Sequence, residues 1–140
     1  MKIKRELPQF DKNSAAIIVA GTLDADFYLA DKGEINKVAT FAIKKSHYSD
    51  RENFGRRGSM VFESGDKAGI MKKFLHSEFL KAFKVNLKSV SGAKTAYLFA
   101  PDNVISDLKK AMPAKWEKTL KLYKGNYGKQ HIFELLEKIS

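Results

Sequence analysis

The chain has 140 residues, the usual length of one domain, and its 26 Lys and Arg residues against 16 Asp and Glu residues give a net charge of +10. It contains no cysteine, which excludes disulfide bonds and thiolate metal sites and fits a reducing, cytoplasmic setting. No apolar run approaches the roughly 20 residues of a membrane-spanning helix, and no apolar stretch follows the charged start as in a secretion signal, so we expect no membrane partner.

The excess of positive charge favours a polyanionic partner, which can be RNA, DNA or an acidic protein surface. Only 4 of the 26 cationic residues are Arg, the residue type that recognises phosphate through two parallel hydrogen bonds. Lysine is also the ordinary solvated charge of a protein surface. Plain surface charge is therefore the alternative to a specific binding surface.

The first residues differ from the rest of the chain. Residues 1–13 are expected to form a basic arm, followed by a single domain at residues 14–140. Pro8 and the charges argue against a regular element in the arm, and Phe10 would anchor it to the domain.

Three strand-like runs, at residues 15–20, 25–30 and 34–45, follow one another across short polar turns. The first is continuously apolar, which is typical of a central strand buried on both faces. The turns are too short for crossovers, so the three runs predict an antiparallel meander, with Gly33 in a hairpin turn. The third run alternates, which predicts a half-buried strand near an edge with these residues on one side: Ile35, Ala39, Phe41 and Ile43.

Residues 46–66 have no sustained period and are predicted to form a loop. A long amphipathic helix is expected at about residues 67–87, with Ser64 or Asp66 at its N-cap. Lysines occupy the side of this helix opposite its apolar residues, and we interpret them as a solvated face rather than a binding face.

The remaining elements alternate between strand and helix. Residues 95–100 predict a short strand, residues 101–112 a helix capped by Asp102 or Asn103, residues 118–125 a strand and residues 129–139 a closing amphipathic helix. Trp116, between the second helix and the last strand, would be a half-buried anchor.

The element order β-β-β-α-β-α-β-α predicts a fold of the α/β class. Strands joined through helices pair in parallel, so the last two strands should lie on the other side of the central strand from the meander. The result is a mixed five-stranded sheet of order 3-2-1-4-5 in a ribonuclease H-like three-layer fold. A flavodoxin-like sheet would need a helix between the first two strands, and the four residues there cannot supply one.

This fold raises the alternative of a metal-dependent nuclease, which holds divalent metals with converging carboxylates. The first strand has no acid, and only Glu78 and Asp102 stand in matching places. A surface role and a capping role explain them better. The three histidines show no metal-ligand spacing, so neither a metal nor another cofactor is expected.

The loop carries three of the four arginines, among glycines and aromatic residues. Such residues suit contacts to the phosphates and unstacked bases of RNA. The alternative interpretation is that the arginines pair with acidic residues of the loop and so order the loop itself. The candidate RNA-binding residues are Lys45, His47, Arg51, Arg56 and Arg57. Gly55 and Gly58 would act as hinges.

Several segments together carry a family resemblance: AAIIVAGTLDADFYLADKGEINKV, FGRRGSM, MKKFLHSEFLKAFKVNL, TAYLFAPDNVISDLKKAM and LYKGNYGKQHIFELLEKI. Over about residues 14–139 the chain resembles the middle domain of archaeal and eukaryotic class-one peptide-chain release factors and Pelota. It also resembles their stand-alone bacterial and archaeal relatives, known as host attachment proteins or release-factor-like proteins.

In release factors, a loop at this position carries Gly-Gly-Gln into the peptidyl-transferase centre. The matching stretch here, residues 55–60, reads GRRGSM and has neither paired glycines nor glutamine. Peptidyl-tRNA hydrolysis is therefore not implied. The resemblance implies the fold and a basic loop presented to ribosomal RNA or tRNA, and we expect a non-enzymatic RNA- or ribosome-associated protein. A protein-interaction module that binds an acidic protein is the further alternative, and the oligomeric state stays open.

Overall fold

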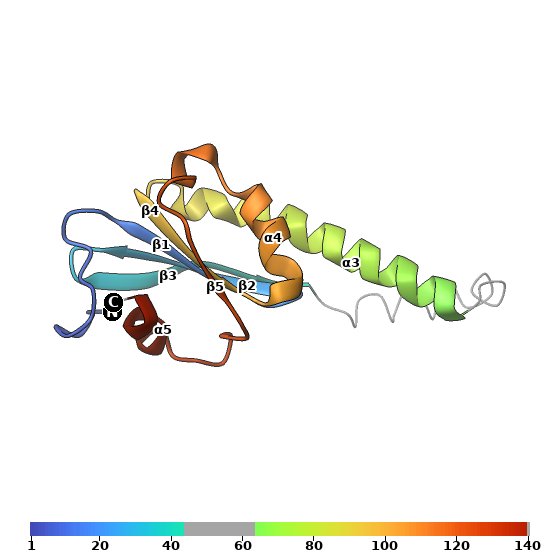
Figure 1. Ribbon diagram of the computed structural model, residues 1–140, viewed down its shortest axis with the longest axis horizontal. Helices are drawn as coiled ribbons and strands as arrows, with labels where there is room; N and C mark the ends of the chain where they lie inside the picture. Colours follow the sequence, from blue (N-terminus) through green and yellow to red (C-terminus); the bar gives the residue numbers. More distant parts are fainter. Residues whose placement is uncertain (44–63, 140) are drawn as a thin grey trace.

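The computed structural model describes residues 1–43 and 64–139, and within the latter range the side chains from residue 72 on (Figure 1). The strands are β1 (Ala15–Ala20), β2 (Asp24–Asp31), β3 (Glu34–Ala42), β4 (Thr95–Ala100) and β5 (Lys121–Lys124). The helices are α3 (Ser64–Asn86), α4 (Asp102–Ala111) and α5 (Ile132–Ile139), with short 3-10 turns η1 (Leu87–Val90) and η2 (Ala114–Trp116). None of the helices described here combines the length and the apolar character that crossing a membrane requires.

The sheet has the predicted order, β3-β2-β1-β4-β5. Strands β1, β2 and β3 pair antiparallel, while β4 pairs parallel with β1 and β5 pairs parallel with β4. All six residues of β1 are buried, as expected for the central strand. The β2–β3 hairpin turns through Lys32 and Gly33, both with positive φ, which is the backbone that a tight two-residue turn requires. The predicted ribonuclease H-like arrangement is thus confirmed.

One prediction about β3 is wrong. Ile35 pairs with Ala30 and packs on the α5 face, whereas Ala39, Phe41 and Ile43 pack on the opposite, α3 face. The cause is a bulge in the register opposite Phe27 and Tyr28, because one extra residue in a strand reverses the facing of every side chain beyond it.

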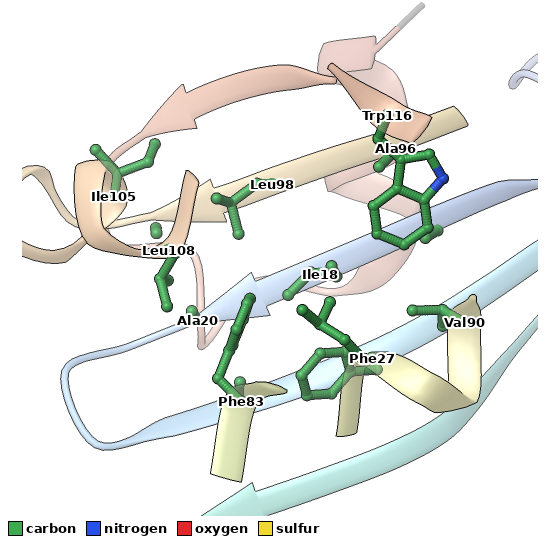
Figure 2. Packing of buried hydrophobic residues seen from close by; sticks show 14 of the residues in the cluster. Ile18, Ala20, Phe27, Phe83, Val90, Ala96, Leu98, Ile105, Leu108 and Trp116 are labelled. Atoms are coloured by element: carbon green, nitrogen blue, oxygen red, sulfur yellow. The ribbon is translucent and has the colours of Figure 1, made fainter. Parts of the chain in front are cut away.

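Helices cover both faces of the sheet, giving three layers. Helices α3 and α4 lie on one face and α5 on the other (Figure 1). The α3 face holds the larger core, in which Phe27 of β2, Phe83 of α3 and Leu108 of α4 are fully buried (Figure 2). On the other face, Leu135 and Leu136 of α5 pack against the odd-numbered residues of β1.

Trp116 completes the α3-face core and is completely buried, not half-buried as predicted. Its indole Nε1 donates a hydrogen bond of 2.9 Å to the carbonyl oxygen of Ala93, just before β4. A long-range partner for the only polar atom of the ring explains why this side chain can be buried entirely.

The N-terminal arm lies along the edge of β3. Ile3 and Leu7 of the arm are buried. The amide of Ile3 donates a hydrogen bond to the carbonyl oxygen of Gly33, and the amide of Ile35 donates one to the carbonyl oxygen of Met1. Phe10 meets Tyr97 edge to face at a ring-centroid distance of 6.1 Å, so it anchors the arm as expected.

Several element boundaries differ from those that the sequence predicts. Helix α3 begins at residue 64, ahead of the expected start near residue 67, and α5 begins at residue 132 rather than 129. The N-cap of α4 is Pro101, with no capping side chain, so neither Asp102 nor Asn103 caps it. Proline suits this position because it has no amide hydrogen to leave unbonded.

Candidate nucleic-acid interface

Positive charge is distributed unevenly along the chain. Residues 72–139 contain 14 Lys and 6 Asp or Glu residues, a net charge of +8, whereas residues 1–43 contain six residues of each sign and are neutral. The part of the chain from residue 72 on, strands and loops included, therefore carries most of the net charge of +10. The loop and the start of α3, residues 44–71, contribute only +2, with six basic and four acidic residues.

Helix α3 presents lysines to solvent along its outer face. Leu75, Phe79 and Phe83 are buried at four-residue spacing and fix the face that rests on the sheet. Lys73 and Lys84 are exposed, 11 residues apart, and fall on the same side of a helix with 3.6 residues per turn. Lys88 continues the same line in η1. We call Lys73, Lys84 and Lys88 the α3 lysine row.

The α3 lysine row has no neutralising partner in the described part of the chain. Lys81, which lies beside the row, pairs with Glu78 at 3.7 Å within the helix. Among the residues that the structure describes, no acidic side chain forms an ion pair with Lys73, Lys84 or Lys88. Lysines left free in this way keep their full charge for a polyanion, although each alone is an ordinary solvated side chain.

Helix α4 lies beside α3 on the same face (Figure 1) and is tied to it by one ion pair. The Nε2 atom of His76 on α3 lies 2.9 Å from the Oδ2 atom of Asp107 on α4. Both side chains are more than one-third exposed, so this contact positions the two helices without burying charge. Exposed Lys109 and Lys110 end α4 and extend the basic surface.

A cavity of about 410 Å³ opens between α3 and α4, beyond the carboxyl ends of β1 and β4. Ligands of open α/β sheets commonly bind at this end of the strands. Its polar lining consists of Thr22, Lys72, His76 and Asn103. This set can donate hydrogen bonds to an oxyanion, and it adjoins the α3 lysine row.

The two carboxylates considered for metal-dependent cleavage, Glu78 and Asp102, have different surroundings. Glu78 pairs with Lys81 on α3, and Asp102 is an exposed residue in the first turn of α4. Within residues 1–43 and 72–139, no three His, Asp or Glu side chains come together as a candidate metal site.

The predicted loop contacts fall outside the described residues. These are Lys45, His47, Arg51, Arg56 and Arg57, with the hinge glycines Gly55 and Gly58. Strand β3 ends at Ala42, before these residues, and α3 begins at Ser64, after them. The loop is thus joined directly to the helix that carries the lysine row.

The other two histidines have local or interhelical roles. His76 belongs to the α3–α4 ion pair, and the Nδ1 atom of His131 accepts a hydrogen bond from the amide of Phe133 at the start of α5.

The α3 lysine row was not predicted as a site. The regular spacing of its lysines is visible in the sequence, but the same spacing occurs on any solvated amphipathic helix. What the fold adds is the burial of Leu75, Phe79 and Phe83, which shows that the lysines of the row share one solvent-facing side of α3 and its extension.

No protein-family model matches the chain, and no curated protein sequence does. Among solved structures, the chain is similar to the crystal structure of archaeal translation termination factor aRF1, with a TM-score of 0.39 and 10% sequence identity. The match covers 92% of this chain and 38% of that structure. The chain therefore spans well under half of the termination factor.

Proposed function

We propose that the protein binds RNA, without catalysing a reaction, through the basic face formed by α3 and the end of α4. The observation that carries the proposal is the exposed α3 lysine row, which has no ion-pair partner among the described residues. Lysines bind phosphates as point charges, so this row would recognise the RNA backbone and not the base sequence.

The loop between β3 and α3 would add contacts of a second kind. Arg51, Arg56 and Arg57 can form paired hydrogen bonds with phosphates, and Lys45 and His47 lie close by in the sequence. Gly55 and Gly58 would let the backbone of this loop adapt to a folded RNA. The RNA we propose is ribosomal RNA or tRNA, following the family resemblance of the sequence.

The test is salt-dependent binding of a labelled single-stranded RNA oligonucleotide, followed by fluorescence anisotropy, beside co-sedimentation with ribosomes. The variant replaces all three lysines of the α3 lysine row with Gln. The matched control replaces three other exposed lysines without ion-pair partners among the described residues: Lys2, Lys12 and Lys129.

Both triple variants lower the net charge by the same amount. A difference in RNA affinity between them therefore reports a specific binding site and not the overall charge of the protein. For the row variant we expect weaker binding and a slope of log K against log salt that is shallower by about 2, because each phosphate contact to a single strand contributes roughly 0.7. The control should bind nearly as the wild type does. Equal losses in the two variants would mean that the charge acts only as an unspecific field, and the proposal would fail.

A further inference from the structure

We infer that the outer edge of β5, with the apolar groove beside it, is a docking site for an extended, acidic segment of a partner protein. The inference does not rest on RNA binding. It rests on an open strand edge, an apolar groove and the lysines around them.

Strand β5 is the last strand of the sheet, and its outer side is open among the described residues except at the carbonyl oxygen of Lys124, which accepts a hydrogen bond of 3.1 Å from the hydroxyl of Tyr127. It pairs only with β4, and no other described backbone segment hydrogen bonds to residues 121–124 on that side. The opposite edge differs, since the N-terminal arm covers part of β3 through a bridge between Lys2 and Glu34. An open edge offers a row of amide and carbonyl groups that only another extended polypeptide can match.

A groove of about 550 Å³ runs between α4 and β5 on the face next to this edge. Its apolar floor consists of Met112, Pro113, Leu120 and Leu122. Leu122 remains 36% exposed although it stands in a strand. Since Leu122 pairs with Leu98, a residue of the α3-face core, it points to the side where the groove lies.

The groove has a positively charged rim. Lys109 and Lys110 line it from α4, and Glu117 is the one acidic residue of the lining. Lys124 has the same strand parity as Leu122, so it faces the same side, and Lys121 faces the other. None of these four lysines has an ion-pair partner among the residues described.

These features together specify the chemistry of the partner segment. When the partner segment pairs with β5, every second side chain of the segment lies over the groove. An apolar side chain among these would cover Leu122, and acidic side chains on either side of it would meet the lysines. A nucleic acid could satisfy the lysines, but neither the strand edge nor the aliphatic floor. The site therefore fits an alternating acidic and apolar peptide better than RNA.

The experiment selects seven-residue peptides from a random displayed library on the full chain, and in parallel on the Leu122→Asp variant. Val85→Asp is the matched control, since it makes the same charge change at an exposed aliphatic residue on α3, 64% exposed. We expect the wild type and Val85→Asp to enrich the same acidic and apolar sequences. Leu122→Asp should bind them about tenfold or more weakly.

The enriched peptide is then synthesised with and without N-methyl groups on alternate backbone amides, and binding is followed by amide NMR shifts. Only the unmethylated peptide should shift the amides of residues 121–124. No enrichment over Leu122→Asp, equal binding of the methylated peptide, or shifts confined to other elements would each overturn the inference. So would displacement of both the unmethylated and the methylated peptide by an oligouridylate, since the groove would then belong to the RNA surface.

Discussion

The indole of Trp116 and the carbonyl group of Ala93 are joined by a fully buried hydrogen bond, 2.9 Å long, between segments 23 residues apart. This bond closes the α3-face core at the point where the chain enters β4. It links η2, which follows α4, to the turn that follows α3. The two helices that carry the basic surface are therefore held in place partly by one side chain.

Trp116→Phe keeps an aromatic ring in the core but leaves the carbonyl group of Ala93 without its partner. We expect the free energy of unfolding to fall by about 1–3 kcal/mol, the cost of a buried unsatisfied group. Trp116→Ala should cost about 3–5 kcal/mol, because it also removes a large core side chain. Urea titration followed by circular dichroism measures both, since either change removes the only tryptophan. A Phe variant as stable as the wild type would show that the bond contributes nothing.

The loop arginines can be tested independently of the α3 lysine row. Replacing both Arg56 and Arg57 by Ala should weaken RNA binding and make the salt slope shallower by about 1.4, for two contacts to a single strand. Arg5→Ala is the control, because Arg5 is the one arginine outside the loop and is exposed. Binding unchanged in the double variant would remove these two arginines from the proposed surface and leave the lysine row as its sole described part.

The His76–Asp107 ion pair should contribute little to stability. Asp107→Asn is expected to lower the free energy of unfolding by at most about 1 kcal/mol, because exposed pairs gain little and are screened by salt. Urea titration at low and high salt measures the change, which should shrink at high salt. A loss of several kcal/mol that salt leaves unchanged would mean that the contact orders α3 and α4 in a way its exposure does not suggest.

Stability should fall at alkaline pH through two tyrosines. Burial raises the pKa of Tyr28 above 10.0, opposed by Lys37 and reinforced by Asp26, and burial with neighbouring tyrosines raises the pKa of Tyr123. The folded state thus disfavours the ionised ring. This contribution to stability is complete below the unfolded pKa of about 10 and disappears as pH rises through the folded-state values.

The double variant Tyr28→Phe, Tyr123→Phe isolates that effect. Its free energy of unfolding should decline less than that of the wild type between about pH 9 and pH 11. Thermal or urea unfolding at several pH values provides the comparison. Parallel declines in the two proteins would assign the alkaline loss to lysine deprotonation instead.

The strand order was predictable because the turns in the meander are too short for any crossover. Residues 21–23 and Lys32–Gly33 leave antiparallel pairing as the only geometry. A continuously apolar first strand then had to be central. These are local facts about chain length and composition, and the fold follows from them.

The errors arose where distant segments decide the outcome. Nothing in the composition of residues 34–43 marks the bulge that sends Ile35 and Phe41 to opposite faces. The complete burial of Trp116 depends on a carbonyl group 23 residues away. The α3 lysine row looks ordinary along the sequence, since its alignment on one exposed side depends on which face of α3 packs on the sheet.

Residues 1–43 are neutral whereas residues 72–139 carry a net charge of +8, and this uneven distribution gives the molecule a permanent electric dipole moment. A polyanion would exert a torque on such a particle before any contact forms, so that encounters begin with its more positive side foremost. Dissolved salt shortens the range of that torque. Added salt should therefore lower the association rate by making the approach less oriented, apart from any effect on the contacts themselves.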